Sequence, residues 1–173
     1  MGRAFDPGTL ARTYRDPVAI AILAVDLFPI YAVLALGWGA APLVWLYWLE
    51  NVILGVVALA RMGATSIKEH PIGLLGMTFI GPFFVIHYGM FCFVHGVLVS
   101  TFADMITGQH NDFMTPSELI STALSSASHM PVFVAAIIAL QIYLFGRDYI
   151  ARGQFRETSI MAEMAAPYSR IIV

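Results

Sequence analysis

Four apolar runs, each about as long as a membrane is thick, constrain this chain more than any other feature. The runs cover about residues 17–38, 41–62, 82–103 and 131–149. An α-helix rises about 1.5 Å per residue, so about 20 residues cross the roughly 30 Å hydrocarbon layer. Only 12% of the residues are charged, against about 25% in soluble domains. The sequence therefore predicts an all-α membrane protein with four transmembrane helices, folded as a single domain over residues 1–173.

The distribution of basic residues predicts how these helices are oriented. All nine precede the first run, follow the second or follow the fourth: Arg3, Arg12, Arg15, Arg61, Lys68, Arg147, Arg152, Arg156 and Arg170. The segment 104–128 contains none of them. The positive-inside rule then places the N-terminus, the 63–81 connection and the C-terminal segment in the cytoplasm. We expect a multi-pass protein of the cytoplasmic (inner) membrane.

Two amphipathic segments outside the four runs are expected to lie on the membrane surface. In the first, about residues 116–128, the stretch from Thr115 to Glu118 matches a capping box that starts a helix. In the second, about residues 157–166, one apolar stripe consists of Ile160, Met161, Met164, Ala165 and Tyr168. Such a stripe is typical of an interfacial helix. The alternative, packing of both stripes against the bundle, fits the pattern equally well.

Polar side chains inside or beside the apolar runs are the candidates for a functional site. The central ones are Glu50, Asn51, His87 and His95, and the supporting ones are Asp26, Tyr47, Tyr88 and His129. A carboxylate at the centre of a span costs about 2.5–3.5 kcal/mol on insertion scales, so it is usually retained for a partner or a function. Small residues at Gly55 and Ala58 lie beside Asn51 on the helix, and they allow another helix to approach closely. We therefore expect Glu50 and Asn51 to face protein.

Three hypotheses account for this polar site. In the first, Glu50 or Asn51 hydrogen-bonds to a histidine and locks two helices together, which gives the protein a structural or interaction role. In the second, a metal ion is bound by carboxylate and imidazole groups drawn from Glu50, His87 and His95. In the third, these groups and Asp26 form a proton or ion relay. Helix positions place Asp26, Glu50 and His95 within about 6 Å of one depth.

Cofactors and partners are only coarsely constrained by the sequence. A metal ion belongs to the second hypothesis, although no HExxH-type ligand spacing is present. A haem is disfavoured, because axial histidines should come from two helices and only the third run has deep histidines. The net charge of -2 argues against nucleic acid. The expected partners are the lipid bilayer and either a second copy of this chain or another membrane protein.

Two motifs resemble those of an uncharacterised prokaryotic membrane-protein family, one of the domain-of-unknown-function families. They are WLEN at residues 48–51 in the second run and HYGxFxxVHG at residues 87–96 in the third. The resemblance implies a multi-pass bacterial membrane protein and no particular activity. Members that the chain resembles continue into further apolar sequence beyond the region of Arg170, which implies that this chain stops before a further transmembrane helix.

Overall fold

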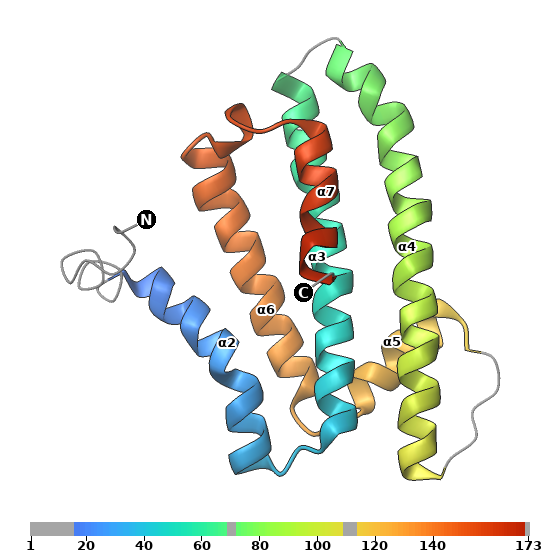
Figure 1. The fold of residues 1–173 in the computed structure, drawn as a ribbon. Coiled ribbons are helices and arrows are strands. Elements are labelled where there is room, and N and C mark those ends of the chain that lie inside the picture. Colours follow the sequence, from blue (N-terminus) through green and yellow to red (C-terminus); the bar gives the residue numbers. More distant parts are fainter. Residues whose placement is uncertain (1–15, 69–71, 109–113, 172–173) are drawn as a thin grey trace, which may run out of the picture. The chain divides into compact units, whose positions relative to one another are not determined.

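The computed structural model describes residues 16–68, 72–108 and 114–171, and every element in these ranges is a helix (Figure 1). Four of the described helices are long and apolar enough to cross a membrane: Pro17–Leu36, Ala40–Lys68, Ile72–Ile106 and Met130–Ala151. The prediction of an all-α membrane protein with four transmembrane helices is therefore confirmed. The chain divides into two compact units, Met1–Gly39 and Ala40–Val173, and the single domain stays a prediction.

The first unit contains one described helix, α2 (Pro17–Leu36). It begins where the sequence dictates, because the Asp16 side chain accepts a hydrogen bond of 3.0 Å from the backbone N–H of Val18. Pro17 occupies the first helical position, where its missing N–H is harmless. The helix ends at Gly37, whose φ of +67° is a left-handed conformation that glycine adopts without strain.

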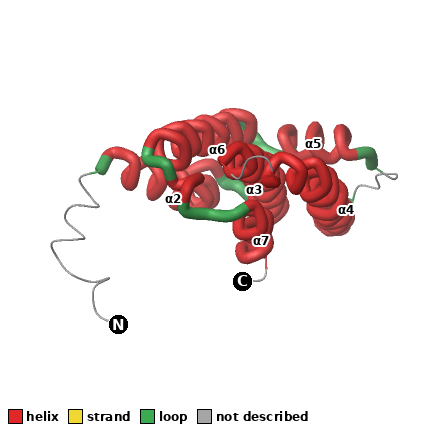
Figure 2. Tube along the Cα trace, turned by 90° about the horizontal axis from the view of Figure 1, so that it is seen from above, coloured by secondary structure: helices red, strands yellow, loops and turns green. Residues whose placement is uncertain are grey.

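The second unit is organised around α3 (Ala40–Lys68), which contacts every other described element of that unit. Figure 2 shows α4 (Ile72–Thr107), α6 (Met130–Leu144) and α7 (Ile160–Ile171) arranged around it. With 29 residues, α3 is about 44 Å long. It is therefore longer than the roughly 30 Å hydrocarbon layer, and part of it must extend into a headgroup region.

The third membrane-spanning helix, α4, is longer than the run expected at about 82–103. It begins at Ile72 because the stretch before Pro82 is also apolar, and Pro82 therefore lies inside the helix. Interior prolines are tolerated in membrane helices, since neighbouring groups compensate for the lost hydrogen bond. Side chains from α3, α4 and α7 form one buried cluster: Ala58, Met62, Phe84, Tyr88, Cys92 and Ile160.

The first amphipathic segment forms α5 (Pro116–Ser125), and both bonds of the predicted capping box are present. Leu119 and Ala123 are fully buried, because α5 packs against α3, α4 and α6. The chain then enters α6 through His129 and continues without a break into a π-helix, η1 (Phe145–Ala151), followed by a short 3₁₀-helix, η2 (Gln154–Arg156). Leu119 and Ala123 of the α5 stripe are thus covered by protein, whereas Ile120 is exposed.

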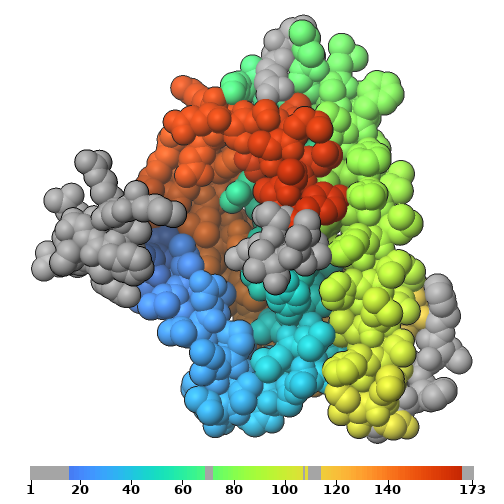
Figure 3. Space-filling model, in the orientation of Figure 1, coloured from blue at the N-terminus to red at the C-terminus, as the bar shows by residue number. Residues whose placement is uncertain are grey.

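The second amphipathic segment forms α7, and its packing differs from the expected interfacial helix. α7 lies alongside α3 rather than across its end (Figure 1), and Figure 3 shows it over the part of α3 nearer Lys68 and beside α4. The buried residues are Ile160, Glu163 and Pro167. Met161 and Ala165, both in the expected stripe, are exposed. Lys68 Nζ donates to the Arg156 carbonyl at 2.6 Å, a bond that ties the turn before α7 to the end of α3.

Candidate functional site

The two sequence motifs meet at the interface between α3 and α4. Trp48 Nε1 on α3 donates a hydrogen bond of 2.8 Å to the backbone carbonyl of Cys92 on α4. In the opposite direction, the Tyr88 hydroxyl on α4 donates a bond of 3.0 Å to the backbone carbonyl of Asn51 on α3. Trp48 and Tyr88 are buried at 4% and 3% exposure. Each helix therefore contributes one buried aromatic donor to the backbone of the other.

Two glycines allow these aromatic rings to lie against the opposite backbone. A Cβ placed on Gly96 would lie 2.8 Å from Cε2 of the Trp48 indole, and one placed on Gly55 would lie 2.8 Å from Cδ1 of the Tyr88 ring. Neither position has room for a side chain, because carbon atoms do not approach so closely. The contact is reciprocal. In one half the ring belongs to α3 and the glycine to α4, and in the other half the ring belongs to α4 and the glycine to α3. We call these four residues, with their two hydrogen bonds, the aromatic–glycine lock.

The polar residues of the WLEN motif lie beside this lock. Asn51 is buried, and its Nδ2 donates to the Tyr47 carbonyl one turn earlier at 3.1 Å. Tyr47 is exposed and Glu50 is half-buried. The structure therefore brings Asn51 and Tyr88 together through the backbone of Asn51. The expectation that Asn51 faces protein agrees with its burial.

The two deep histidines lie outside the lock. His87 is exposed and stacks on Phe83, one turn earlier, with ring centroids 5.3 Å apart. It also lies 6.0 Å from the Tyr168 ring of α7. His95 is half-buried and contacts the Phe91 ring at 6.1 Å. Being eight residues apart on α4, the two histidines are separated by about 12 Å along the axis.

The two remaining candidates come from other elements. Asp26 is exposed on α2, in the first unit. His129 precedes α6 with a φ of +68°, a left-handed conformation that histidine adopts more readily than most residues. Among the described residues, no group of three or more His, Cys, Asp or Glu side chains could hold a metal ion. The metal and relay hypotheses stay predictions.

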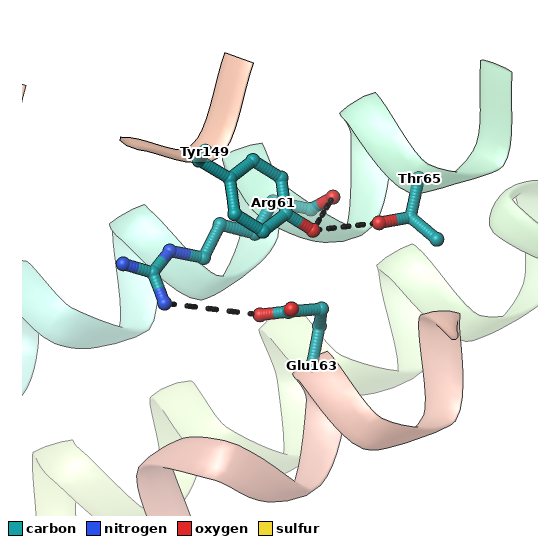
Figure 4. A network of polar contacts seen from close by, with 4 residues as sticks. All are labelled: Arg61, Thr65, Tyr149 and Glu163. Carbon is teal, nitrogen blue, oxygen red and sulfur yellow. Dashed lines mark hydrogen bonds and ion pairs between the residues drawn. The ribbon is translucent and has the colours of Figure 1, made fainter. Parts of the chain in front are cut away.

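A second polar cluster, not foreseen from the sequence, lies where α3, η1 and α7 meet (Figure 4). The Tyr149 hydroxyl lies 2.6 Å from Thr65 Oγ1 and donates to the Arg61 carbonyl at 3.1 Å. The Arg61 guanidinium lies over the Tyr149 ring, 5.2 Å from its centroid. Its Nη1 lies 4.0 Å from Oε2 of Glu163 on α7. One arginine thus contacts an aromatic ring and a buried carboxylate from two different elements.

The sequence signals for this cluster were ambiguous. The sequence indicates Arg61 only as one of the basic residues that determine topology, and it does not single out Glu163. Glu163 follows Ile160 by three residues, which places both on one helical face. That spacing was the available signal. The π-helical geometry of η1 could not be foreseen, although π-turns often occur at functional sites.

Comparison with known proteins identifies the family and nothing finer. No curated protein and no solved structure matches the chain. A family model, described as a family of unknown function (DUF6498), matches residues 9–173. This match covers nearly the whole chain, including both motifs and all of the helices described above. The chain therefore belongs to the DUF6498 family of unknown function.

Proposed function

We propose that this chain is a membrane-embedded scaffold whose α3–α4 pair is held by the aromatic–glycine lock and whose apolar outer face contacts another membrane protein. The observation that carries the proposal is the lock itself. Both motifs contribute to it, through two interhelical hydrogen bonds and two ring-on-glycine contacts. Interhelical hydrogen bonds in membranes are worth about 0.6–1.7 kcal/mol each.

The chemistry of the motif residues supports a structural role. Trp48 and Tyr88 direct their donors to backbone carbonyls of the other helix, so they serve helix packing. Asn51 donates within α3, to the Tyr47 carbonyl. His87, in contrast, lies at an exposed position on α4, the helix that carries Tyr88. A packed helix pair with an apolar outside is what a partner helix or a second copy of the chain can pack against.

The first test compares the proposal with the metal and relay hypotheses. The purified chain and its Glu50→Gln variant are analysed for metal content and, in liposomes, for proton flux. A scaffold contains no stoichiometric metal and carries no flux, and both forms stay folded. Stoichiometric metal, or a flux that Glu50→Gln abolishes, would contradict the scaffold proposal.

The second test looks for the partner directly. A photo-crosslinking amino acid replaces Met90, which is 59% exposed on α4, in the chain expressed in native membranes. We expect a discrete protein adduct, either of this chain with itself or with another membrane protein. Ser121, exposed on α5, is the control position and should give no such adduct. Adducts with lipid alone at Met90 would contradict a protein-contacting role.

A further inference from the structure

A cavity of about 230 Å³ lies between α3 and α7, next to the Arg61–Glu163 pair. Its walls are mainly Leu54, Val57 and Arg61 from α3, and Glu163, Ala166 and Pro167 from α7. It therefore combines one positive group, one negative group and an apolar wall. Small-molecule sites often have this composition, a mostly apolar lining with a few polar groups that fix orientation.

The Arg61 guanidinium has hydrogen-bonding capacity left over. Its Nε is buried and has no hydrogen-bond partner among the described residues. The 4.0 Å distance to Glu163 is longer than the roughly 2.7–2.9 Å of a charge-assisted hydrogen bond. The pair of Asp148 on η1 and Arg152 just after it, by contrast, is closed at 2.9 Å. Arg61 and Glu163 thus face one cavity without closing on each other.

Glu163 offers acceptors on the other side of the cavity. Its side chain is only 11% exposed, although an isolated buried carboxylate is strongly disfavoured. The Glu163 carboxylate therefore suits a ligand that carries N–H donors.

The position of Arg61 along α3 corresponds to the level of lipid headgroups. Arg61 lies 20 residues beyond Ala41, near the start of α3, which is about 30 Å, one hydrocarbon thickness. The apolar residues Leu54 and Val57 precede it and so lie on its hydrocarbon side. The charged part of the cavity is thus at headgroup level, and the apolar part is at acyl-chain level.

We propose that this cavity binds the headgroup of a zwitterionic lipid that carries a phosphate and a primary ammonium group. The phosphate pairs with Arg61, the ammonium pairs with Glu163, and the first part of an acyl chain lies against Leu54, Val57 and Pro167. The cavity is smaller than the roughly 300–1,000 Å³ of typical ligand pockets, which suits a headgroup rather than a whole lipid. A quaternary ammonium lacks the N–H donors that Glu163 would accept.

The test is a lipid titration of the detergent-purified full chain, followed by native mass spectrometry. The probes are phosphatidylethanolamine, phosphatidylglycerol and phosphatidylcholine with the same acyl chains. We expect phosphatidylethanolamine to bind about tenfold more tightly than phosphatidylglycerol, a difference of about 1.4 kcal/mol, because phosphatidylglycerol has no ammonium group to pair with Glu163. Glu163→Gln should remove this preference, and Arg61→Gln should weaken the binding of all three lipids, because each carries a phosphate.

Two control variants test whether binding depends on this cavity. Asp148→Asn removes a carboxylate from an ion pair outside the cavity and should leave the lipid preference unchanged. Ala166→Phe fills the cavity from an exposed position without changing charge, so it should abolish binding even if Glu163→Gln fails to fold.

Three results would overturn the proposal. They are equal binding of the three lipids by the unmodified chain, an unchanged preference in Glu163→Gln, and full binding in Ala166→Phe. Free phosphoethanolamine that binds as tightly as the lipid would overturn the lipid as the source of the headgroup. None of these results depends on the scaffold proposal, because the cavity lies between α3 and α7 and the lock lies between α3 and α4.

Discussion

The sharpest prediction concerns Gly96, the glycine under the Trp48 indole. A methyl group added by Gly96→Ala would lie 2.8–2.9 Å from three atoms of that ring, where ordinary contact distances are 3.4–4 Å. The indole cannot move away freely, because it is 4% exposed and its Nε1 is bonded to the Cys92 carbonyl. Either the two helices separate or the ring rotates and loses its hydrogen bond.

The expected magnitude follows from these two losses. Overpacking by one methyl group costs about 1–3 kcal/mol, and the lost interhelical hydrogen bond costs a further 0.6–1.7 kcal/mol or so. Replacing glycine by alanine in a helix returns about 0.5–1 kcal/mol through backbone entropy. We therefore expect Gly96→Ala to lower the free energy of unfolding by about 1–4 kcal/mol.

The matched control is Gly89→Ala on the same helix. A Cβ at Gly89 meets no atom within 4 Å, so this change keeps the helix-propensity gain and omits the collision. Unfolding in detergent micelles should show Gly89→Ala at or above the unmodified chain and Gly96→Ala well below it. In a Trp48→Leu background the effect of Gly96→Ala should shrink, because the colliding ring is gone. Equal stability of the two alanine variants would refute the lock.

Three further predictions test other parts of the structure. Tyr88→Phe keeps the ring on Gly55 but loses the bond to the Asn51 carbonyl, so the free energy of unfolding should fall by about 0.6–1.7 kcal/mol; no change relative to the exposed control Tyr143→Phe would contradict the bond. Thr115 N–H and Oγ1 both donate to the Glu118 carboxylate at 2.7 Å, and the backbone bond above all holds the pKa of Glu118 below its ordinary value of 4.5. Because the folded pKa is lowered, the stabilisation is present above pH 4.5 and is lost as the pH falls through the folded value; Glu118→Gln should remove this part of the acid sensitivity in thermal melts, and an identical pH profile would exclude it. Cysteines introduced at positions 110, outside the described residues, and 156 should be labelled from opposite faces of the membrane, and labelling from one face would remove the four-span topology.

The sequence by itself determined the features that depend on local or one-dimensional information. Long apolar runs predicted the four membrane-spanning helices, because length and hydropathy alone decide whether a helix can cross the hydrocarbon layer. The capping box at Thr115 and Glu118 was predicted for the same reason, since its two hydrogen bonds join residues three apart. The expectation that Asn51 faces protein came from its small neighbours on the helix face.

Only the tertiary structure decided which groups meet across helices. Trp48 is known from the sequence only as part of the WLEN motif, and its bond to the Cys92 carbonyl, 44 residues away, places it in the lock. His87 and His95 share a helix with Tyr88, yet the rotation of α4 directs Tyr88 into the interface and leaves His87 exposed. Hydropathy describes how apolar each residue is, but it does not give the rotation of a helix about its axis, which decides the residues that face the interface.

The same limit explains the Arg61–Glu163 pair. The sequence indicates an amphipathic segment here and does not single out Glu163. In the structure, the turn through η2 and the bond from Lys68 to the Arg156 carbonyl lead α7 back along α3. That packing buries Glu163 opposite Arg61, which lies on α3, 102 residues earlier in the chain. The sequence shows that a residue is charged, but it does not show which helix packs against it. Arg61 becomes part of a site only because α7 packs against α3.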